Sequence, residues 1–195
     1  MLLTLLTAVS CKESDEDNNE YSNWQAINDN FYRTLTDSVK QAKADGGGDD
    51  WVFMRRWSRE AGAATLQDTV TAHILKSGSG SGCPLYADSV RIHYRGSLLP
   101  TAEHPEGYVF DKSFTGQVFD TATSTPAAFL VSGLVDGMVT ALQHMHIGDR
   151  WLLFIPYNMG YGSTSNGSIP AYSLLKFEVE LVAYCHPGGN LGTFN

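Results

Sequence analysis

The sequence lacks the patterns that mark most reaction centres, and it has few basic residues. No G-x-S-x-G, H-E-x-x-H, Walker or C-x-x-C spacing occurs. This argues against the nucleophilic, zinc-dependent, phosphate-binding and thiol-redox chemistry that those spacings support. The 13 basic residues are outnumbered by 21 acidic ones, and the net charge is −8. Because phosphate binding needs a basic face, nucleic acid is not expected as a partner.

Metal ligands are also sparse, since the 6 histidines are scattered along the chain. His144 and His146 stand two residues apart at the end of a predicted helix, where their side chains point to different sides. A solvated helix terminus is therefore favoured there over a metal site. We expect no metal and no cofactor.

The overall composition is that of a globular protein, with 43% hydrophobic and 17% charged residues. A chain of 195 residues holds one domain of ordinary size and something smaller. Most of the negative charge is local, because residues 12–50 carry ten acidic and four basic side chains. The rest of the chain has no strong electrostatic field of its own.

The first residues, MLLTLLTAVSC, suit the apolar core of a secretion signal at residues 1–10. The run is far shorter than the roughly 20 residues that cross a bilayer. Ala8, Val9 and Ser10 before Cys11 resemble the lipobox of bacterial lipoproteins, which implies that Cys11 carries lipid. No Lys or Arg precedes the run, and Ala8 stands where leucine is commoner, so an ordinary initiator segment with a chance cysteine is the alternative.

Residues 11–20 are acidic and polar, which predicts a solvated tether. Their lysine followed by acidic residues resembles the surface-export signal of Bacteroidetes lipoproteins. That resemblance implies a lipid-anchored protein of the cell envelope, on the periplasmic or the surface face of the outer membrane. The lipid would be its only contact with the membrane.

Residues 21–65 are predicted to form a small helical N-terminal segment. Apolar residues recur there at steps of three and four, the helical period. Ser22 or Asn23 can cap the helix, and the run DGGGDD ends it. The following WVFMRRWSRE is interpreted as a helical cap packed on the main domain, with a dimerisation arm as the alternative. The helical positions are Trp24, Ile27, Phe31, Leu35, Val39 and Ala42.

From Leu66 onward the pattern predicts strands around one helix. DTVTAHIL, DSVRIHYRGSLL, PAAFLV, DRWLLFIP and SLLKFEVELVAY read as strands, and GLVDGMVTALQHMHIG reads as an amphipathic helix that ends near Gly148. The glycine–serine run KSGSGSGCP is interpreted as a flexible turn, because no lysine or helix follows it as in a phosphate loop. About six strands and one central helix make an α+β domain with an antiparallel sheet.

Five segments follow one another along the chain: VRIHYRGSL, GYVFDKSF, PAAFLVSGLVDGMVTALQHMHIGDR, LLFIPYNMGYGSTSNGSIP and SLLKFEVELV. In this order they resemble the successive signatures of FKBP-type peptidyl-prolyl isomerases. The resemblance covers about Leu66 to Tyr184 and is closest to lipoprotein members found in Bacteroidetes. It implies a curved antiparallel sheet of about five to six strands wrapped around one short helix. The domain would span residues 66–185, with a tail at 186–195.

The resemblance implies that the protein twists X–Pro bonds of exported polypeptides in an apolar pocket between sheet and helix. Tyr94 would form one wall, while Phe110 and Asp111 of the first VFD would supply an aromatic face and a buried carboxylate that hydrogen-bonds Tyr94. Tyr161, between two glycines, would donate its hydroxyl to a substrate carbonyl. The remaining positions are Leu134 and Val135 at the lip, Met138 on the floor, Ile169 on the mobile rim and Phe177 completing the wall.

Some features leave alternatives open. Met138 stands where the family usually has tryptophan, and Ala127 stands where many members have an aromatic residue, so a non-catalytic proline-peptide binding or chaperone module is the alternative function. A purely structural lipoprotein is a third. The second VFD, at Val118, competes with the first for the pocket positions. Tyr94 and Phe177 could also be plain core residues. Macrolide binding and the oligomeric state stay undecided.

The resemblance also implies a disulfide. In this fold the RIHY strand pairs antiparallel with the last strand, so the residues before the first and at the end of the second should lie close. We expect Cys83 to bond Cys185, in a compartment outside the cytosol where disulfides form.

Overall fold

The computed structural model describes residues 20–60, 62–116 and 123–191. Cys11 and the second VFD lie outside these residues. Two α-helices, seven strands and three short 3-10 helices are described. In chain order they are α1 (Trp24–Ala44), β1 (Trp51–Arg55), η1 (Leu66–Asp68), β2 (Thr69–Lys76), β3 (Ser89–Ser97), β4 (Val109–Lys112), β5 (Ala127–Leu130), η2 (Val131–Gly133), α2 (Asp136–Leu142), β6 (Arg150–Ile155), η3 (Tyr157–Met159) and β7 (Leu175–Cys185).

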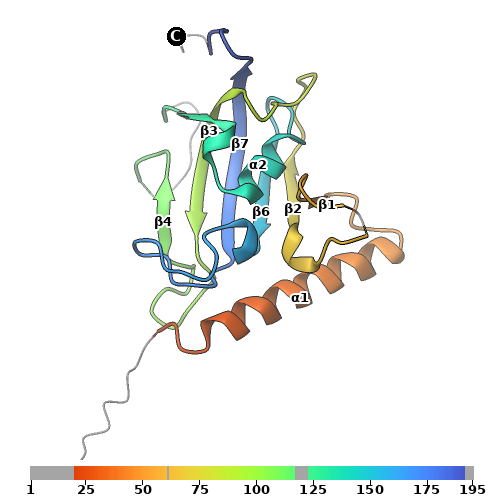
Figure 1. Cartoon of the computed structure of the whole chain (residues 1–195), viewed down its shortest axis with the longest axis vertical. Coiled ribbons are helices and arrows are strands. Elements are labelled where there is room, and N and C mark those ends of the chain that lie inside the picture. The colour runs from red at the N-terminus through yellow and green to blue at the C-terminus, as the bar shows by residue number, and fades with distance from the viewer. Residues whose placement is uncertain (1–19, 61, 117–122, 192–195) are drawn as a thin grey trace, which may run out of the picture.

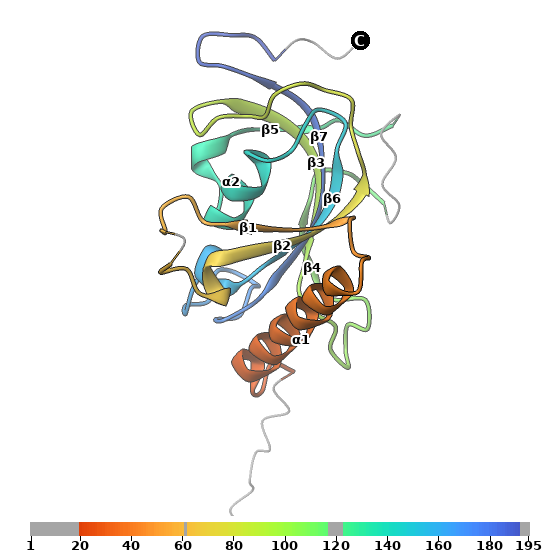
Figure 2. The same ribbon diagram turned by 90° about the vertical axis from the view of Figure 1, so that its right-hand side faces the viewer.

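The strands form one curved sheet that wraps around α2. Their order is β1-β2-β6-β7-β3-β4, β5 also pairs with β3, and each pairing is antiparallel. Figure 2 shows α2 inside the bend of the sheet and α1 below it. This arrangement confirms the predicted fold class, an α+β domain with an antiparallel sheet around a short helix.

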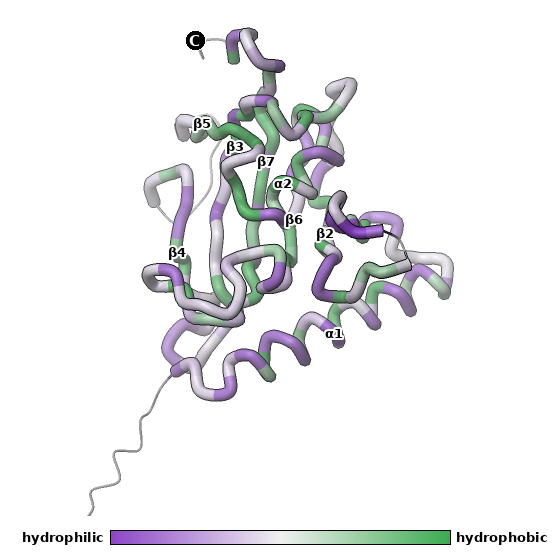
Figure 3. Tube along the Cα trace, in the orientation of Figure 1, coloured by the Kyte–Doolittle hydropathy of each residue, from purple (hydrophilic) through white to green (hydrophobic). Residues whose placement is uncertain are grey.

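The core lies between the sheet and α2, and the alternation of each strand explains it. On β7, Leu175, Phe177, Val179 and Leu181 share one face and are all buried. Gly137 of α2 is buried against Ile155 of β6, where a Cβ would lie 2.9 Å from the Ile155 Cγ1. Figure 3 shows hydrophobic residues concentrated on β6, β7 and α2, whereas α1 is largely hydrophilic.

The central helix is shorter than its sequence period suggests. The helix ends at Leu142, and Met145, predicted as its last buried turn, lies beyond it. Met145 is nevertheless fully buried, because turn hydrogen bonds carry the chain on, such as Met145 N to Leu142 O at 3.2 Å. The buried apolar residues thus keep a helical spacing beyond the residue at which the helix itself ends.

The N-terminal helix forms where predicted, but it buries a different face. Asn28, Tyr32 and Thr36 are buried, while Ile27 is 46% exposed. These polar side chains can be buried because each is hydrogen-bonded: Thr36 donates to Tyr32 O at 2.9 Å, and the Tyr32 hydroxyl bonds Thr69 O and Thr71. Because these residues are polar, the spacing of apolar residues along the helix does not predict that they are buried. The expected side-chain cap is also absent, since Asn23 makes no capping bond.

The prediction of a helical segment after α1 is wrong, because residues 51–55 form strand β1. This strand pairs with β2, with Met54 opposite Val70. Trp51 stacks on His73 with ring centroids 4.6 Å apart and lies near Phe154 at 6.1 Å. Four successive residues of this strand are apolar, because both of its faces pack against other side chains. The strand therefore lacks the alternation of apolar and polar residues that predicts a β-strand.

The glycine–serine run is held against a neighbouring turn rather than hanging as a flexible loop. Gly78 N donates to the buried Asp149 carboxylate at 2.6 Å, and Gly80 N donates to Ile147 O at 3.1 Å. A Cβ on Gly80 would lie 2.8 Å from Ile147 N, and one on Gly78 would lie 2.6 Å from Asp149 N. Glycine is required here for close approach of two backbones, a role that composition alone does not reveal.

Candidate active site

A cavity of about 220 Å³ opens between α2 and the inner face of the sheet. Its size lies near the lower end of ordinary small-molecule sites. Most of its wall is apolar, with two tyrosines and one aspartate at the edge. The lining residues are Ile92, Tyr94, Asp111, Phe129, Gly133, Leu134, Val135, Met138, Tyr161 and Phe177. Seven of the nine predicted pocket residues are among them.

The floor of the cavity is apolar and buried. Met138 enters from α2 and Phe177 from β7, and their side chains are 3% and 7% exposed. Ile92 and Tyr94 alternate with polar residues along β3, so both face the cavity from the same side of the strand. A ligand seated on this floor would lose contact with water.

Two side chains meet at the edge of the cavity. The Tyr94 hydroxyl donates a hydrogen bond to Asp111 Oδ2 at 2.8 Å. Burial, and then the hydrogen bond to Asp111, raise the pKa of Tyr94 well above its usual value, so this phenol stays protonated at any physiological pH. The expected contact between the two residues is present. The expectation of a buried carboxylate is wrong, because Asp111 is exposed at the mouth.

The glycines on either side of Tyr161 are each needed for a different structural reason. Gly162 has a φ of 77°, in the left-handed region that favours glycine. Gly160 lies against Leu175, whose Cδ1 would be 2.9 Å from an added Cβ. Together they hold Tyr161 at the mouth of the cavity, 37% exposed. Burial, followed by the charge of Asp111, raises the pKa of the Tyr161 phenol, so it remains a hydrogen-bond donor.

Two predicted pocket residues are not part of the lining. Phe110 packs edge-on against Phe177, with ring centroids 5.4 Å apart, and both rings cover Gly96. Ile169 is 6% exposed and pairs with Asn166 inside its own loop. These residues support the wall instead of forming it. The direction of a side chain decided this, and sequence spacing does not report it.

Phe129 is a lining residue that the sequence reasoning missed. It stands two residues after Ala127 on β5, and its ring lies 5.7 Å from that of Tyr94. Phe129 therefore places an aromatic side chain on the same face of β5 as Ala127, the position where many family members have an aromatic residue. The alternation of side chains along PAAFLV indicates that Phe129 lies on the same face as Ala127. Ile92 and Gly133 were missed as well.

The first VFD takes the position that the prediction preferred. It forms most of β4, which pairs with β3 so that Asp111 lies opposite Gly96 and within reach of Tyr94. The competing copy at Val118 lies outside the described residues.

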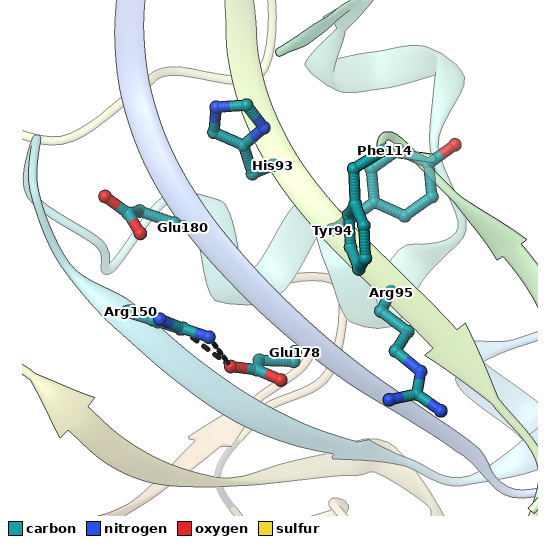
Figure 4. Close-up of a pocket in the computed structure, with 7 residues that line it drawn as sticks. All are labelled: His93, Tyr94, Arg95, Phe114, Arg150, Glu178 and Glu180. Carbon is teal, nitrogen blue, oxygen red and sulfur yellow. Dashed lines mark hydrogen bonds and ion pairs between the residues drawn. The ribbon is translucent and has the colours of Figure 1, made fainter. Parts of the chain in front are cut away.

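A second cavity lies on the opposite face of the sheet, and it is too small for a ligand. Its volume is about 10 Å³, roughly one water. Figure 4 shows Arg150 paired with Glu178 there, and His93 and Glu180 further along the strands. Burial lowers the pKa of His93, so its ring is mostly neutral near pH 7. We interpret this region as a packed outer face.

The predicted disulfide is not formed, since Cys83 and Cys185 are both free thiols. Cys83 Sγ lies 3.9 Å from His146 Nε2, while Cys185 sits opposite Ser89 in the sheet. The preceding glycine–serine run is fixed on the turn at 147–149, which directs Cys83 toward His146. Within the described ranges, no three His, Cys, Asp or Glu side chains are grouped to hold a metal ion.

Comparisons with known proteins agree with this geometry. The family model of the FKBP-type peptidyl-prolyl cis-trans isomerases matches residues 83–182. The chain belongs to this family. It is 34% identical over 131 residues to the FKBP-type 22 kDa peptidyl-prolyl cis-trans isomerase of Escherichia coli, and 35% identical over 133 residues to the macrophage infectivity potentiator of Trypanosoma cruzi.

Both matches span 67–68% of this chain but only 57% and 61% of those relatives. The crystal structure of FkpA from Escherichia coli matches 84% of this chain and 65% of that one, with a TM-score of 0.50 and 23% identity. This structural likeness supports the fold alone.

Proposed function

We propose that the protein is a peptidyl-prolyl cis-trans isomerase acting on proline-containing polypeptides. The observation that carries the proposal is the apolar cavity with the Tyr94–Asp111 pair and the Tyr161 hydroxyl at its mouth. Rotation about an X–Pro bond breaks no covalent σ bond, and its barrier of about 18–20 kcal/mol comes from lost amide resonance. The reaction needs no nucleophile, which suits a site without cysteine, histidine or lysine in its lining.

The cavity favours the twisted amide by differential binding. The twisted form has less charge separation than the planar one, so a floor of Met138, Phe177 and Ile92 stabilises it relative to the ground state. Tyr161 donates to a substrate carbonyl, and Asp111 fixes Tyr94 in the wall. A thousandfold acceleration requires only about 4 kcal/mol of such preference.

The test is an isomerisation assay on purified protein beginning at Lys12, with proline tetrapeptides that have alanine, leucine or phenylalanine before proline. We expect acceleration with each peptide, and the largest with leucine and phenylalanine, whose side chains are more apolar than that of alanine. Val135→Arg, which places a charge at the lip of the cavity, should abolish it. The matched control Leu85→Arg adds the same charge at a position 59% exposed and outside the lining, and should keep it.

The alternative is a module that binds proline peptides without useful catalysis. The observation in its favour is the flexible Met138 on the floor, where a rigid tryptophan is usual for the family. If folded wild-type protein accelerates none of the peptides yet binds them in fluorescence titrations, this alternative replaces the enzyme. Competition by a macrolide in the same titration would show that such ligands share the cavity.

We further propose that the protein is held at the cell envelope, facing the periplasm or the cell surface, by lipid on Cys11. The support is the apolar run that ends in a lipobox-like sequence and the acidic tether behind it. Within the described residues, none of the helices has the length and apolarity needed to cross a membrane. Exported polypeptides would then be the clients. Mass spectrometry of the mature N-terminal peptide tests this, and an unmodified Cys11 or a retained Met1 contradicts it.

A further inference from the structure

Residues 20–60, which precede the family match, contact both ends of one loop at the rim of the cavity. We call residues 157–174 the rim loop; it begins with η3 and carries Tyr161. Its two contacts come from residues 20–60, whereas the family model matches only residues 83–182. Figure 1 shows the rim loop, in blue, above the first turns of α1.

The first contact fixes the C-terminal end of the rim loop on α1. Trp24 Nε1 donates to Ser173 Oγ at 2.7 Å, and Leu174 N donates to Asn28 Oδ1 at 2.8 Å. Asn28 in turn donates to Trp24 O at 2.6 Å. All four residues are at most 5% exposed. Buried hydrogen bonds of this kind are costly to break, because water does not replace the lost partner.

The second contact fixes the N-terminal end of the rim loop and links it to the opposite lip. The Arg56 guanidinium donates to the carbonyl oxygen of Asn158. The same group lies 3.2 Å from Asp136 Oδ2, in the first turn of α2, directly after the lip residue Val135. Arg56 is 18% exposed and Asp136 is 62% exposed, so solvent screens this ion pair and its value lies in the position it gives the guanidinium. One side chain thus joins both sides of the cavity mouth.

The tip of the rim loop is exposed at residues 163–168, whereas the loop is closed by its own hydrogen bonds nearer its ends. Gly162 N donates to Tyr157 O at 2.9 Å, and Tyr172 N donates to Gly162 O at 3.0 Å. These bonds lie within the loop and do not attach it to the rest of the protein. Tyr172 has a φ of 60°, which a non-glycine residue adopts at a cost of about 1 kcal/mol or more. Such a conformation persists only where the surroundings impose it, and Tyr172 directly precedes the Ser173 contact.

We propose that residues 20–60 position the rim of the cavity, with Trp24, Asn28 and Arg56 as positioning residues for prolyl isomerisation. This inference rests on the proposed function. None of the three touches the substrate site. They keep Tyr161 over the floor, so their loss lowers the fraction of molecules with a competent rim. The apparent affinity for peptide falls by that same fraction, while the bound state keeps its chemistry.

The experiment compares Arg56→Gln and Trp24→Phe with wild type. Arg56→Gln removes the guanidinium fork, and Trp24→Phe keeps a buried ring but removes the donor to Ser173. We expect amide exchange of Gly162, Ile169 and Tyr172 to quicken about three- to tenfold in each variant, the size of one lost hydrogen bond. KM should rise by a smaller factor with kcat nearly unchanged, because it follows the fraction of molecules with a competent rim.

The matched control is Arg59→Gln, which removes a pair with Asp68 in the same segment but touches no rim residue. It should leave KM and rim exchange unchanged. A merely structural role would lower the folded fraction and thus the apparent kcat, at constant KM. The inference is overturned if both folded variants keep wild-type KM and rim exchange.

Two failures can be told apart by this design. If wild-type protein accelerates no X–Pro peptide, the proposed function fails, and rim exchange alone decides the inference. Unchanged exchange in Arg56→Gln and Trp24→Phe then overturns it, and faster exchange confined to residues 157–174 supports it. Arg56→Gln removes no ring from the core, so this variant remains informative even if Trp24→Phe fails to fold.

Discussion

Tyr94 and Tyr161 present two phenols to one cavity, but their surroundings give them different roles. Tyr94 is tied to Asp111 at 2.8 Å, so its hydroxyl serves the wall. Tyr161 is 37% exposed, and no hydrogen bond of its hydroxyl is described. It can therefore donate to a substrate carbonyl without first breaking a bond inside the protein. Of the two, Tyr161 is the better candidate for direct contact with the twisting amide.

This difference predicts the effect of Tyr161→Phe. The substitution should lower kcat/KM by a few-fold to tenfold, about 1 kcal/mol, because one net hydrogen bond to the substrate is lost. The peptide isomerisation assay measures it. Tyr86→Phe is the control, since Tyr86 is 60% exposed and lies outside the cavity lining. An unchanged kcat/KM in Tyr161→Phe would remove this hydroxyl from the mechanism.

The floor residue Met138 gives a second prediction at this scale. Met138→Trp should raise kcat/KM, because a rigid aromatic floor loses less conformational freedom on binding than the flexible thioether chain. The cavity of about 220 Å³ offers room for the larger ring. Met145→Leu, a fully buried residue beyond the helix and outside the lining, controls for general repacking. Lower activity with unchanged stability would mean that the floor is already well shaped.

Among the elements, α1 is docked by polar contacts, and this makes its attachment sensitive to alkali. The buried Tyr32 hydroxyl bonds Thr69 O and Thr71 on β2. Burial is the largest cause that raises the pKa of Tyr32 above its usual value of 10.0. Above pH 10 the unfolded chain loses this proton while the native protein keeps it. The native state then binds more protons, so the free energy of unfolding falls as pH rises.

We therefore predict two effects of Tyr32→Phe. Near pH 7 the variant should be less stable by about 1–3 kcal/mol, because Thr69 O loses its donor and the buried Thr71 hydroxyl loses its acceptor. Between pH 10 and about 12 its stability should fall less steeply than that of wild type, since one titrating group is missing. Urea denaturation at several pH values measures both. Equal slopes for the two proteins would show that Tyr32 ionises normally when folded.

The same elements show what the sequence could and could not predict. The alternation on β3 and β7 is visible in the residue types, and β6 is a run of apolar residues after Arg150, so these strands and the fold class were predictable. The strand at 51–55 was not, because Trp51 to Met54 are all apolar and show no period. The buried face of α1 was missed for the opposite reason, since Asn28 and Thr36 are polar yet satisfied.

For the site, motif order predicted residues that the structure brings to one cavity, among them Tyr94, Asp111 and Tyr161, while their roles stay predictions. The errors concern side-chain direction and depth. Phe110 turns onto Phe177 and Phe129 turns into the cavity. Packing decides such directions after the backbone is formed, so they are not encoded in spacing. The rim contacts of Arg56 and Trp24 join residues more than 100 positions apart, which local patterns cannot show.

At the scale of the whole molecule, the folding unit is larger than the family match at residues 83–182. Strand β2 lies before the match, yet it pairs with β6 along Thr71 to Lys76 and separates β6 from the edge. Residues 20–60 add β1 at that edge and cover Phe154 with Phe31 of α1. Strand β2 completes the sheet, whereas residues 20–60 cover its edge and hold the rim loop in position.

This division predicts different outcomes for two truncations. A chain that starts at Gly62 keeps β2, so it should fold and unfold cooperatively, at a lower melting temperature because Phe154 and the outer edge are uncovered. A chain that starts at Cys83 loses β2 and leaves β6 with unpaired backbone groups, so it should aggregate. Circular dichroism melts and light scattering distinguish the two. A soluble chain from Cys83 that melts cooperatively near the wild-type temperature would show that the matched domain is complete without β2.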